Sequence, residues 1–491
     1  MEKEIPLEVL NIVEKLTQAG YKAYLVGGCV RDLILGLNPK DWDIATNAKP
    51  LDIQKLFPNS LYENSFGTVA VKTDSEDSAL KLIEVTTFRL EGKYTDKRHP
   101  DEIKFAKTIE EDLSRRDFTV NALAINLPPK NLKLPSALID PYKGAEDISA
   151  KLICCVGNPE ERFNEDALRL IRAIRFACGL TFNIEEKTRK AINKNANLLS
   201  FIAKERVRDE FVKIVMSQNA AKGIQLLEDT GLMQYIIPEL CEGINCAQNK
   251  HHIYTVWEHN LRSLDYTVSK NYSFEIRLAA LLHDVGKPKT KRGQGESATF
   301  YGHEVVGAKM VSRILKDLKF SSAIVEKVVH LVRCHLFYYN VGDVTPAGVR
   351  RFIKRVGSEN IPDLIKIREA DRIGSGVPKA VPYKLRHLLY MIEKVKEDPV
   401  SSRMLAINGR DVMDIAKLNP SSKVGQILDI LLDEVLEEPK RNEAVYLKER
   451  VVELANMSEA ELVALQNKAR NRKEEFEKGL EEEMKERYYV K

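Results

Sequence analysis

Two aspartates stand on either side of Trp42, directly after a glycine turn and a short apolar stretch. The segment reads GGCVRDLILGLNPKDWDIAT from Gly27 to Thr46. Because alternate side chains of a strand point to the same face, we expect Asp41 and Asp43 to project together. Two carboxylates at close range raise each other's pKa, and a divalent cation between them removes that cost. Mg²⁺ suits carboxylate oxygens and commonly shares its ligand shell with phosphates, so the pair indicates phosphoryl-transfer chemistry.

The residues just before this pair form a pattern that suits phosphate binding. An apolar run leads into Gly27 and Gly28, which predicts a strand that ends at a glycine turn with exposed backbone N–H groups. Arg31 follows one helical turn later and can add a charge-assisted hydrogen bond to a triphosphate. A bare Asp-x-Asp pattern is common by chance and would indicate only a helix cap and a surface strand. Its combination with two glycines and an arginine at this spacing is more specific.

A second candidate region is the arginine-rich stretch RFNEDALRLIRAIRFACG. We predict one helix here, with Asn164 as its N-cap and Gly179 as its stop. Taken alone, its acids near the start and bases toward the end are ordinary helix electrostatics. The predicted buried side consists of Leu170, Ile171, Ile174 and Ala177. The predicted charged side consists of Glu165, Asp166, Arg169, Arg172 and Arg175.

The elements around these motifs mix strands and helices only up to about residue 126. Thr108 and Glu111 form a capping box that opens a further helix, and strand signals nearly vanish after Pro141. From about residue 160, apolar residues recur at helical spacing, so the chain is predicted to be α+β, with a small mixed head and an all-α body. Strands are predicted at 21–26, 41–45, 67–73, 80–89 and 101–106, and short helices at 29–36 and 50–57.

Composition and length limit the class of protein. A chain of 491 residues suggests about three domains, and a net charge of only +4 confines any nucleic-acid site to a local basic patch. The seven cysteines lack Cys-x-x-Cys spacing, which favours reduced thiols in a cytoplasmic protein. No apolar run is long enough to span a bilayer, so no membrane association is expected.

A second site is indicated by the histidines, of which seven of the nine fall between His251 and His335. An adjacent His-Asp pair inside an aliphatic helix is unusual, because a buried aspartate needs a strong partner. A lone histidine is more often a core residue, but an ordered series of histidines and aspartates favours a metal site for Mn, Fe, Ni, Co or Mg. The series consists of His259, His283, Asp284, His303, His335 and Asp371.

Taken together, these motifs resemble those of class II tRNA nucleotidyltransferases, the CCA-adding enzymes and their poly(A) polymerase relatives. The likeness rests on the glycine-arginine turn with its aspartates, on RRDFTVNA and on EDALRLIRAIRF, and it is strong over roughly the first 220 residues. It implies a head domain like that of DNA polymerase beta. It also implies Mg²⁺-dependent, template-independent addition of C, C and A to tRNA 3′ ends from CTP and ATP, with release of pyrophosphate. The histidine series resembles the HD superfamily of metal-dependent phosphohydrolases, which implies a second, phosphohydrolase activity.

The resemblance also implies roles for single residues. Asp41 and Asp43 would hold Mg²⁺, and Glu84 is the candidate third catalytic carboxylate, with a plain surface glutamate as the alternative. Asp166 and Arg169 would offer an acceptor and a donor to the Watson–Crick edge of C or A, which share an exocyclic amine. The implied nucleotide-binding set is Gly27, Gly28, Arg31, Arg116, Asp117, Asn121, Asp166, Arg169, Arg172 and Arg175.

The expected organisation follows from the same resemblance. The predicted domains are a catalytic head at 1–145, a helical neck for nucleotide recognition and RNA binding at 146–235, an HD domain at 236–390 and a tRNA-binding helical tail at 391–491. The expected partner is tRNA, held by its acceptor arm and elbow through shape and backbone contacts, with the protein as a monomer or a homodimer. Lys204, Arg206, Arg208 and Lys213 are candidate contributors, with a solvated helix face as the alternative.

Several alternatives stay open at this stage. A partial enzyme would add only CC or only A, although the polar segment LEGKYTDKRHPDEIKF has the full length that accompanies complete CCA addition in the family. A poly(A) polymerase would carry a GRRF-type signature, which is absent from the chain. A phosphohydrolase whose head only binds nucleotides belongs to a different class. An RNA-binding scaffold would not explain why the motifs of both head and neck match together.

Overall fold

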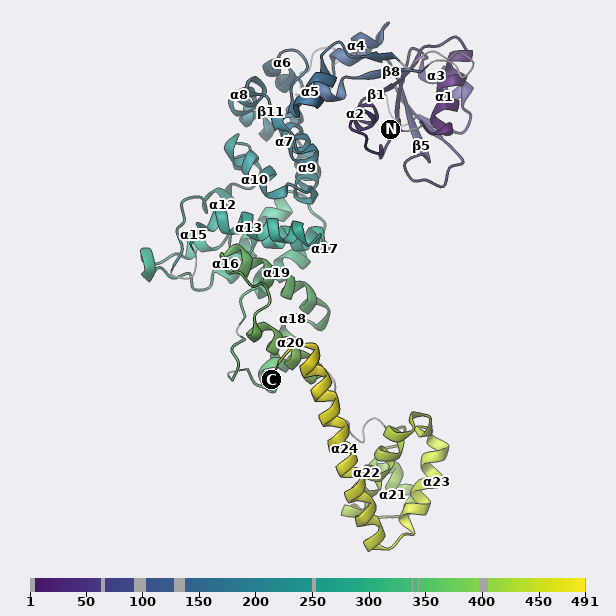
Figure 1. The fold of residues 1–491 in the computed structure, drawn as a ribbon, viewed down its shortest axis with the longest axis vertical. Helices are drawn as coiled ribbons and strands as arrows, with labels where there is room; N and C mark the ends of the chain where they lie inside the picture. The colour runs from purple at the N-terminus through teal and green to yellow at the C-terminus, as the bar shows by residue number, and fades with distance from the viewer. Residues whose placement is uncertain are drawn as a thin grey trace. The chain divides into compact units, whose positions relative to one another are not determined.

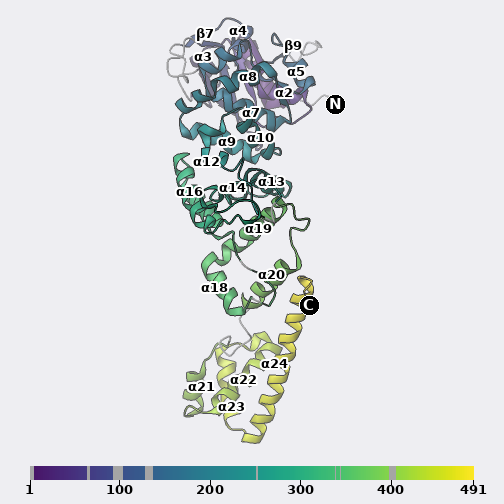
Figure 2. The same cartoon turned by 90° about the vertical axis from the view of Figure 1, so that its left-hand side faces the viewer.

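The computed structural model of the chain describes residues 5–62, 67–91, 103–127, 137–249, 253–337, 339–342, 344–396 and 405–490. Figures 1 and 2 show its ribbon in two views. The chain divides into two compact units. The first consists of Met1–Leu336 and Asp363–Pro378, and the second of Phe337–Pro362 and Lys379–Lys491.

The head is built on a seven-stranded mixed sheet in the order β3-β4-β5-β2-β1-β8-β9. At its centre, β2 (Asp43–Thr46) pairs antiparallel with β1 (Ala23–Val26) and parallel with β5 (Leu82–Thr87). A separate pair, β6 (Arg89–Glu91) and β7 (Ile103–Phe105), is antiparallel. The outer strands are β3 (Ser60–Tyr62), β4 (Thr68–Lys72), β8 (Ala124–Asn126) and β9 (Ala137–Ile139). The predicted α+β class is confirmed.

Short helices connect the strands of the head. The helix α2 begins directly after Gly27, which adopts a φ of 79° that favours glycine. The capping box of Thr108 and Glu111 opens α4, as predicted. The helices of the head are α1 (Leu7–Gln18), α2 (Gly28–Ile34), α3 (Pro50–Leu56), α4 (Ile109–Ser114), η1 (Thr119–Asn121) and α5 (Gly144–Ala150).

The arginine-rich stretch forms two helices, so the prediction of a single helix is wrong. The first, α6 (Pro159–Glu165), is capped by Asn158 rather than by Asn164. Asp166 is extended, and its carboxylate accepts a hydrogen bond from the N–H of Leu168 at 3.0 Å, which starts α7 (Leu168–Leu180). The helix ends one residue beyond Gly179. The predicted buried side is confirmed, since Leu170, Ile171, Ile174 and Ala177 have no exposed surface.

The rest of the neck is helical. Its elements are β10 (Leu152–Ile153), β11 (Asn183–Ile184), α8 (Glu186–Asn195), η2 (Ala196–Phe201), α9 (Lys204–Met216) and α10 (Ala220–Asp229). The helix α9 packs on α7 on one side and on α14 (Phe274–Leu282) on the other. Arg277 of α14 is fully buried and donates to the carbonyl oxygens of Val215 and Ser217 at the end of α9. This buried cation ties the neck to the histidine-rich helices that follow.

The histidine-rich helices complete the first unit. α16 and α17 pack together, and α14 packs between α13 and α17. The elements are α11 (Met233–Ile236), α12 (Pro238–Cys241), α13 (Val256–Ser269), α15 (Lys287–Thr290), η3 (Gly295–Ser297), α16 (His303–Asp317), α17 (Ser322–Cys334) and α19 (Ile361–Gly374).

The second unit is entirely helical in its described part. Figure 1 shows the long helix α24 (Glu459–Arg487) running beside α22 (Ser422–Glu437), against which it packs. Its other elements are α18 (Pro346–Val356), η4 (Ser358–Asn360), α20 (Tyr383–Lys396), α21 (Gly409–Ala416), η6 (Pro439–Arg441) and α23 (Ala444–Ala455). No helix in the described ranges of the chain is both long enough and apolar enough to cross a membrane.

Candidate active site

Three carboxylates lie in one cleft of about 740 Å³ at the sheet of the head. Glu84 of β5 is the register partner of Asp43 on the parallel strand β2, so the two side chains emerge at adjacent positions. Asp41 lines the same cleft from a bend before β2 rather than from within the strand. The bend, and not strand alternation, therefore brings Asp41 into the cleft beside Asp43.

The electrostatics of these carboxylates suit a bound cation. Burial raises the pKa of Asp43 to about 6, with a further contribution from Glu84 and a smaller one from Asp41. Arg116 opposes this shift. Because burial and two neighbouring carboxylates penalise the ionised form of Asp43, a divalent cation that restores this form fits the site.

Arginines dominate the rest of the cleft wall, and an unpredicted residue holds two of them. Asp112 has 1% of its surface exposed. Its carboxylate accepts hydrogen bonds from Arg115 at 2.8 Å and from Arg116 at 3.2 Å. Burial alone would raise the pKa of Asp112, but Arg115 and Arg116 hold it below its usual range. Only the burial of Asp112, an acid about one helical turn before the RRDF segment, could have indicated that it holds the two arginines.

The glycine turn is shaped by its neighbours in the cleft. A Cβ atom on Gly27 would come within 2.7 Å of the Nη1 atom of Arg116. The N–H of Gly27 donates to the carbonyl oxygen of Leu123 at 3.0 Å. Glycine is therefore required here both by its positive φ and by the close approach of the Arg116 guanidinium.

A hydrogen-bond chain joins the three motifs that the sequence singles out. Arg31 donates to the Oδ1 atom of Asn121 at 2.6 Å, and Asn121 donates to Asp117 at 3.3 Å. Arg172 of α7 donates to the Oδ2 atom of Asp117 through Nη2 at 2.7 Å and Nε at 2.9 Å. Burial opposes ionisation of Asp117, yet Arg172 brings its pKa down to about 2. Asp117 thus lines the cleft as an anion that fixes Arg172.

The predicted base-reading pair, Asp166 and Arg169, lies at the junction between α6 and α7. Asp166 lines the cleft and has its Oδ2 atom 3.4 Å from the Nη2 atom of Arg206. Arg169 donates to Glu165 at 2.7 Å and to the carbonyl oxygen of Arg115 at 3.0 Å. This network leaves only 7% of the surface of Arg169 exposed, and its side chain lines the cleft. Arg206, predicted on an RNA-binding face, lines the cleft instead.

Phe176 is a further cleft residue that the sequence did not indicate. Its ring lies 4.0 Å from the guanidinium carbon of Arg175, 5.2 Å from that of Arg172 and 5.6 Å from that of Arg31. Glu210 of α9 holds Arg175 at 3.3 Å from the opposite side. Cation–π contacts of this kind fix the orientation of planar guanidinium groups.

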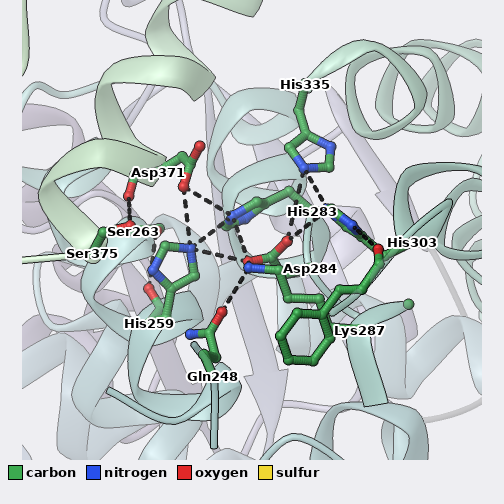
Figure 3. A network of polar contacts seen from close by, with 12 residues as sticks. Gln248, His259, Ser263, His283, Asp284, Lys287, His303, His335, Asp371 and Ser375 are labelled. Carbon is green, nitrogen blue, oxygen red and sulfur yellow. Dashed lines mark hydrogen bonds and ion pairs between the residues drawn. The ribbon is translucent and has the colours of Figure 1, made fainter. Parts of the chain in front are cut away.

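The predicted histidine series meets at one buried centre, as Figure 3 shows. Asp284 is bracketed by two pairs of histidines. Its Oδ2 atom lies 3.2 Å from His259 and 3.3 Å from His283, and its Oδ1 atom lies 3.3 Å from His303 and 3.7 Å from His335. Lys287 approaches Oδ2 to 2.6 Å. Asp371 completes the set at 3.5 Å from His259.

The tautomers of these histidines indicate metal ligation. The Nδ1 atoms of His303 and His335 lie 2.8 and 2.6 Å from backbone carbonyl oxygens, which only accept hydrogen bonds. Their Nε2 atoms lie 3.3 Å apart. Burial, with His283 nearby, lowers the pKa of His335 to about 3, so this imidazole is neutral near pH 7. Neutral nitrogens oriented by backbone carbonyls are how proteins present histidine to a metal.

Two overlapping groups of side chains could each hold a metal ion, and both include Asp284. Within each group the ligand atoms lie within 4.8 Å of one another. A cleft of about 750 Å³ lies at this centre. In addition to candidate ligands, it is lined by Lys287, Arg368 and the exposed Tyr301. The first group is His259, His283 and Asp284, and the second is Asp284, His303 and His335.

Two predicted features lie outside the described residues. The polar segment that bears on complete or partial addition falls largely on residues 92–102. His251 and His252, at the start of the histidine-rich region, are also outside. The seven cysteines are all described and all carry free thiols, so the expectation of no disulfide is confirmed.

Three family models match the chain in succession. Residues 23–154 match the poly A polymerase head domain, residues 181–244 match a probable RNA- and SrmB-binding site of polymerase A, and residues 256–375 match the HD domain. The order of these matches, with the carboxylate cleft in the head, is that of a nucleotidyltransferase that carries an HD domain.

Comparison with similar proteins identifies the family within this class of nucleotidyltransferases. A CCA-adding enzyme of Lactobacillus helveticus (strain DPC 4571) is 31% identical over 427 residues, which cover 87% of this chain and 92% of that relative. The chain belongs to the CCA-adding enzyme family, as the sequence motifs predicted. A CCA-adding enzyme of Geobacillus sp. (strain WCH70) is 44% identical over 235 residues, which cover 48% of this chain and about half of that relative's length, 55%.

A solved structure supports the fold over most of the chain. The crystal structure of the Bacillus stearothermophilus CCA-adding enzyme in complex with CTP matches with a TM-score of 0.57 at 28% identity. The match covers 91% of this chain and 96% of that chain. The predicted fold, a nucleotidyltransferase head on a helical body with an HD domain, is therefore confirmed.

Proposed function

We propose that this chain adds C, C and A in turn to the 3′ end of tRNA in the cytoplasm, taking CTP and ATP and releasing pyrophosphate. The observation that carries the proposal is the cleft of about 740 Å³ in which three carboxylates face arginines from the head and the neck. Its support is the similarity to a CCA-adding enzyme over nearly the whole of both chains, and to a solved CCA-adding enzyme that holds CTP.

Asp41, Asp43 and Glu84 would hold a divalent cation, and we propose Mg²⁺ because all three donors are carboxylate oxygens. When bound, the cation makes the 3′-hydroxyl more acidic and neutralises phosphate charge. The chain itself holds the hydroxyl and the α-phosphate in line at the edge of β2 and β5. The 3′-oxygen then bonds to the α-phosphorus while the bond to pyrophosphate breaks.

The arginines receive the charge of the triphosphate. The N-terminal end of α2 at Gly28 and the side chains of Arg31 and Arg116 line the cleft near the carboxylates. Asn121 and Asp112 already hold these two arginines in place. Preorganised cations stabilise the negative charge that develops on the leaving pyrophosphate without reorganising during the reaction. Arg172 and Arg175 would lie further along the same path.

Base choice would rest on Asp166 and Arg169. The carboxylate of Asp166 can accept from the exocyclic amine that C and A share, while Arg169 donates to a ring nitrogen or carbonyl. U and G carry a carbonyl oxygen in place of that amine, so an acceptor would face the carboxylate of Asp166, which is unfavourable. The hydrogen bond from the N–H of Leu168 fixes Asp166 in this role.

The experiment is incubation of the purified protein with tRNA transcripts that end at the discriminator base, at C, at CC and at CCA. Each nucleotide is supplied singly and together, and the products are read at single-nucleotide resolution. Addition that stops at CCA is expected. Arrest after CC, or A added only to a CC end, would indicate a partial enzyme, and a long A tail would indicate a poly(A) polymerase.

We also propose a second activity at the histidine centre, namely metal-dependent hydrolysis of phosphate esters. The specific observation is the convergence of four histidines and two aspartates beside the cations Lys287 and Arg368. The candidate substrates are phosphomonoesters and 2′,3′-cyclic phosphates at RNA ends. The candidate metals are Mn, Ni, Co, Fe and Mg, because the donor set mixes imidazole and carboxylate.

This second activity has its own test. Phosphate release from RNA that ends in a terminal or a 2′,3′-cyclic phosphate is measured with each metal in turn. Asp284→Ala should abolish the release, whereas Asp43→Ala should leave it unchanged. Release that survives in Asp284→Ala would contradict the assignment to the histidine centre.

A further inference from the structure

The second unit contains two parts with opposite charge. The bundle at 405–490 has 14 Lys and Arg against 19 Asp and Glu. The helices α18 and α20, which pack on each other, have eight Lys and Arg against a single acid, Glu393. Nucleic-acid backbones are attracted by local positive potential, so the bundle is the weaker candidate for RNA contact.

The cations of the bundle are also largely neutralised by ion pairs. Arg450 lies 2.8 Å from Glu434, Arg470 lies 3.2 Å from Asp429, and Arg487 also has carboxylate partners. Such pairs make weak phosphate contacts, because an incoming phosphate must compete with the resident carboxylate.

The helix α18 differs because its charge is not compensated. It carries four exposed cations and no acid, and none of the four forms an ion pair in the described part of the chain. The four are Arg350, Arg351, Lys354 and Arg355.

The same helix borders a cleft of about 460 Å³. Arg351 and Arg355 stand at the cleft, and apolar side chains, Phe337, Phe352 and Leu388 of α20, line its inside. The rings of Phe337 and Phe352 lie 5.1 Å apart, and the guanidinium of Arg355 lies 5.8 Å from the ring of Phe352. Cations beside aromatic rings form the combination that binds RNA phosphates together with an unstacked base.

We propose that α18 and its cleft form an RNA-contact site, at which Arg351 and Arg355 bind backbone phosphates and the cleft receives one unstacked nucleotide. The site takes RNA rather than protein because the charged side chains of α18 are all positive and its cleft of about 460 Å³ is lined by aromatic rings. The inference rests on the proposed function in naming tRNA as that RNA. It places the contact in 337–396 and not in the acidic bundle that the sequence favoured.

The test compares two double variants that remove the same charge. Arg351→Ala with Arg355→Ala changes the site, and Lys440→Ala with Lys448→Ala changes exposed cations of the bundle. The affinity for a tRNA that ends at the discriminator base is measured from 50 to 300 mM KCl. We expect the site variant to bind about tenfold more weakly and to lose about one to two units from the slope of log K against log salt. The bundle variant should match the unchanged protein.

Two further measurements separate this inference from the proposed function. CTP affinity and the incorporation rate at saturating tRNA should be unchanged in the site variant, because the cleft of the head is intact. Photo-crosslinking of tRNA that carries 4-thiouridine should label the peptide that contains Phe352.

The outcomes can be told apart. Unchanged affinity and slope in the site variant, or an equal loss in the bundle variant, would overturn the inference whether or not the protein adds nucleotides. A protein that binds tRNA through α18 but incorporates nothing would refute the proposed function and leave this site standing. Absence of any tRNA binding would overturn both.

Discussion

The cleft of the head and the histidine centre both contain acids and cations, but the two sites differ in burial and in electrostatics. In the cleft, carboxylates such as Asp112 and Asp117 hold several of the arginines, and the candidate metal-binding acids line the same cleft. In the histidine centre the candidate ligands are buried, and the Nε2 atoms of His303 and His335 lie 3.3 Å apart. The first arrangement suits the proposed charged substrate, whereas the second suits a metal cation.

The largest expected effect is a loss of nucleotide incorporation when the cleft of the head is changed. Asp43→Ala removes one oxygen ligand and should lower nucleotide incorporation by about 10³-fold or more, because metal-dependent transfer loses its charge stabilisation. The measurement is single-nucleotide incorporation, with thermal unfolding as the check on folding. Asp74→Ala, an exposed acid outside the cleft, is the matched control. Incorporation near the normal rate in Asp43→Ala would contradict the assignment of Asp43 as a metal ligand of the cleft.

The second prediction concerns the anion behind the cleft. Asp112→Ala leaves Arg115 and Arg116 without their buried partner, which should cost about 3–5 kcal/mol of unfolding free energy. The measurement is urea unfolding of the two proteins at pH 7. A loss below about 1 kcal/mol would mean that water replaces Asp112 and that the arginines are not preorganised by it.

The third prediction concerns removal of metal from the histidine centre. Chelation should lower the unfolding free energy by about 3–4 kcal/mol, the linkage expected for metal at 100 to 1,000 times its dissociation constant. The measurement is thermal unfolding with and without a chelator. His335→Ala should lose most of this shift, whereas Asp43→Ala should keep it. An equal shift in both variants would place the stabilising metal elsewhere.

The fourth prediction uses the pKa of Asp43, about 6 in the cleft without bound cation. Below that pH the carboxyl takes up a proton that a bound cation must displace, so the apparent affinity for Mg²⁺ should fall as pH falls. Well below pH 6 the Mg²⁺ concentration for half-maximal incorporation should rise about tenfold per pH unit. The measurement is a Mg²⁺ titration at pH 5, 6, 7 and 8. A flat dependence below pH 6 would contradict the assignment of Asp43 as a ligand.

The smallest expected effect tests the contact between Arg206 and Asp166. Arg206→Ala should leave Asp166 less firmly oriented and reduce the preference for CTP over UTP by about tenfold, the equivalent of about 1.4 kcal/mol. The measurement is kcat/KM for each nucleotide on the same tRNA. Glu205→Ala, an exposed neighbour on α9, is the control. An equal loss for CTP and UTP would make Arg206 a general contact instead of one that acts through Asp166.

The motifs, the α+β head and the helical body could be predicted from the sequence because their signals are local. The strand segments and the buried side of α7 follow from the spacing of apolar residues. The capping box follows from a threonine and a glutamate three positions apart. The site residues could be grouped because each motif carries several of them at short spacing. The histidine series stood out because seven of nine histidines fall within one region.

Contacts between distant segments could not be predicted in this way. The break between α6 and α7 at Asp166 was missed, because helical periodicity continues through it. The pairing of Glu84 with Asp43 depends on a parallel register between strands that lie about forty residues apart. Phe176 and Arg206 enter the cleft through packing of the neck on the head, and the contact of Asp112 with Arg115 and Arg116 depends on its burial in the head; no local pattern encodes either.

The sequence by itself determined which chemical groups this protein has and which family it belongs to, since both are written in residue types at short spacing. Only the tertiary structure decided which groups meet. It placed the arginines against buried carboxylates, it turned the histidine nitrogens toward Asp284, and within the described residues it left the cations of α18 without ion pairs. The physical reason is that burial and Coulomb interaction depend on distances through space, which separation along the chain does not fix.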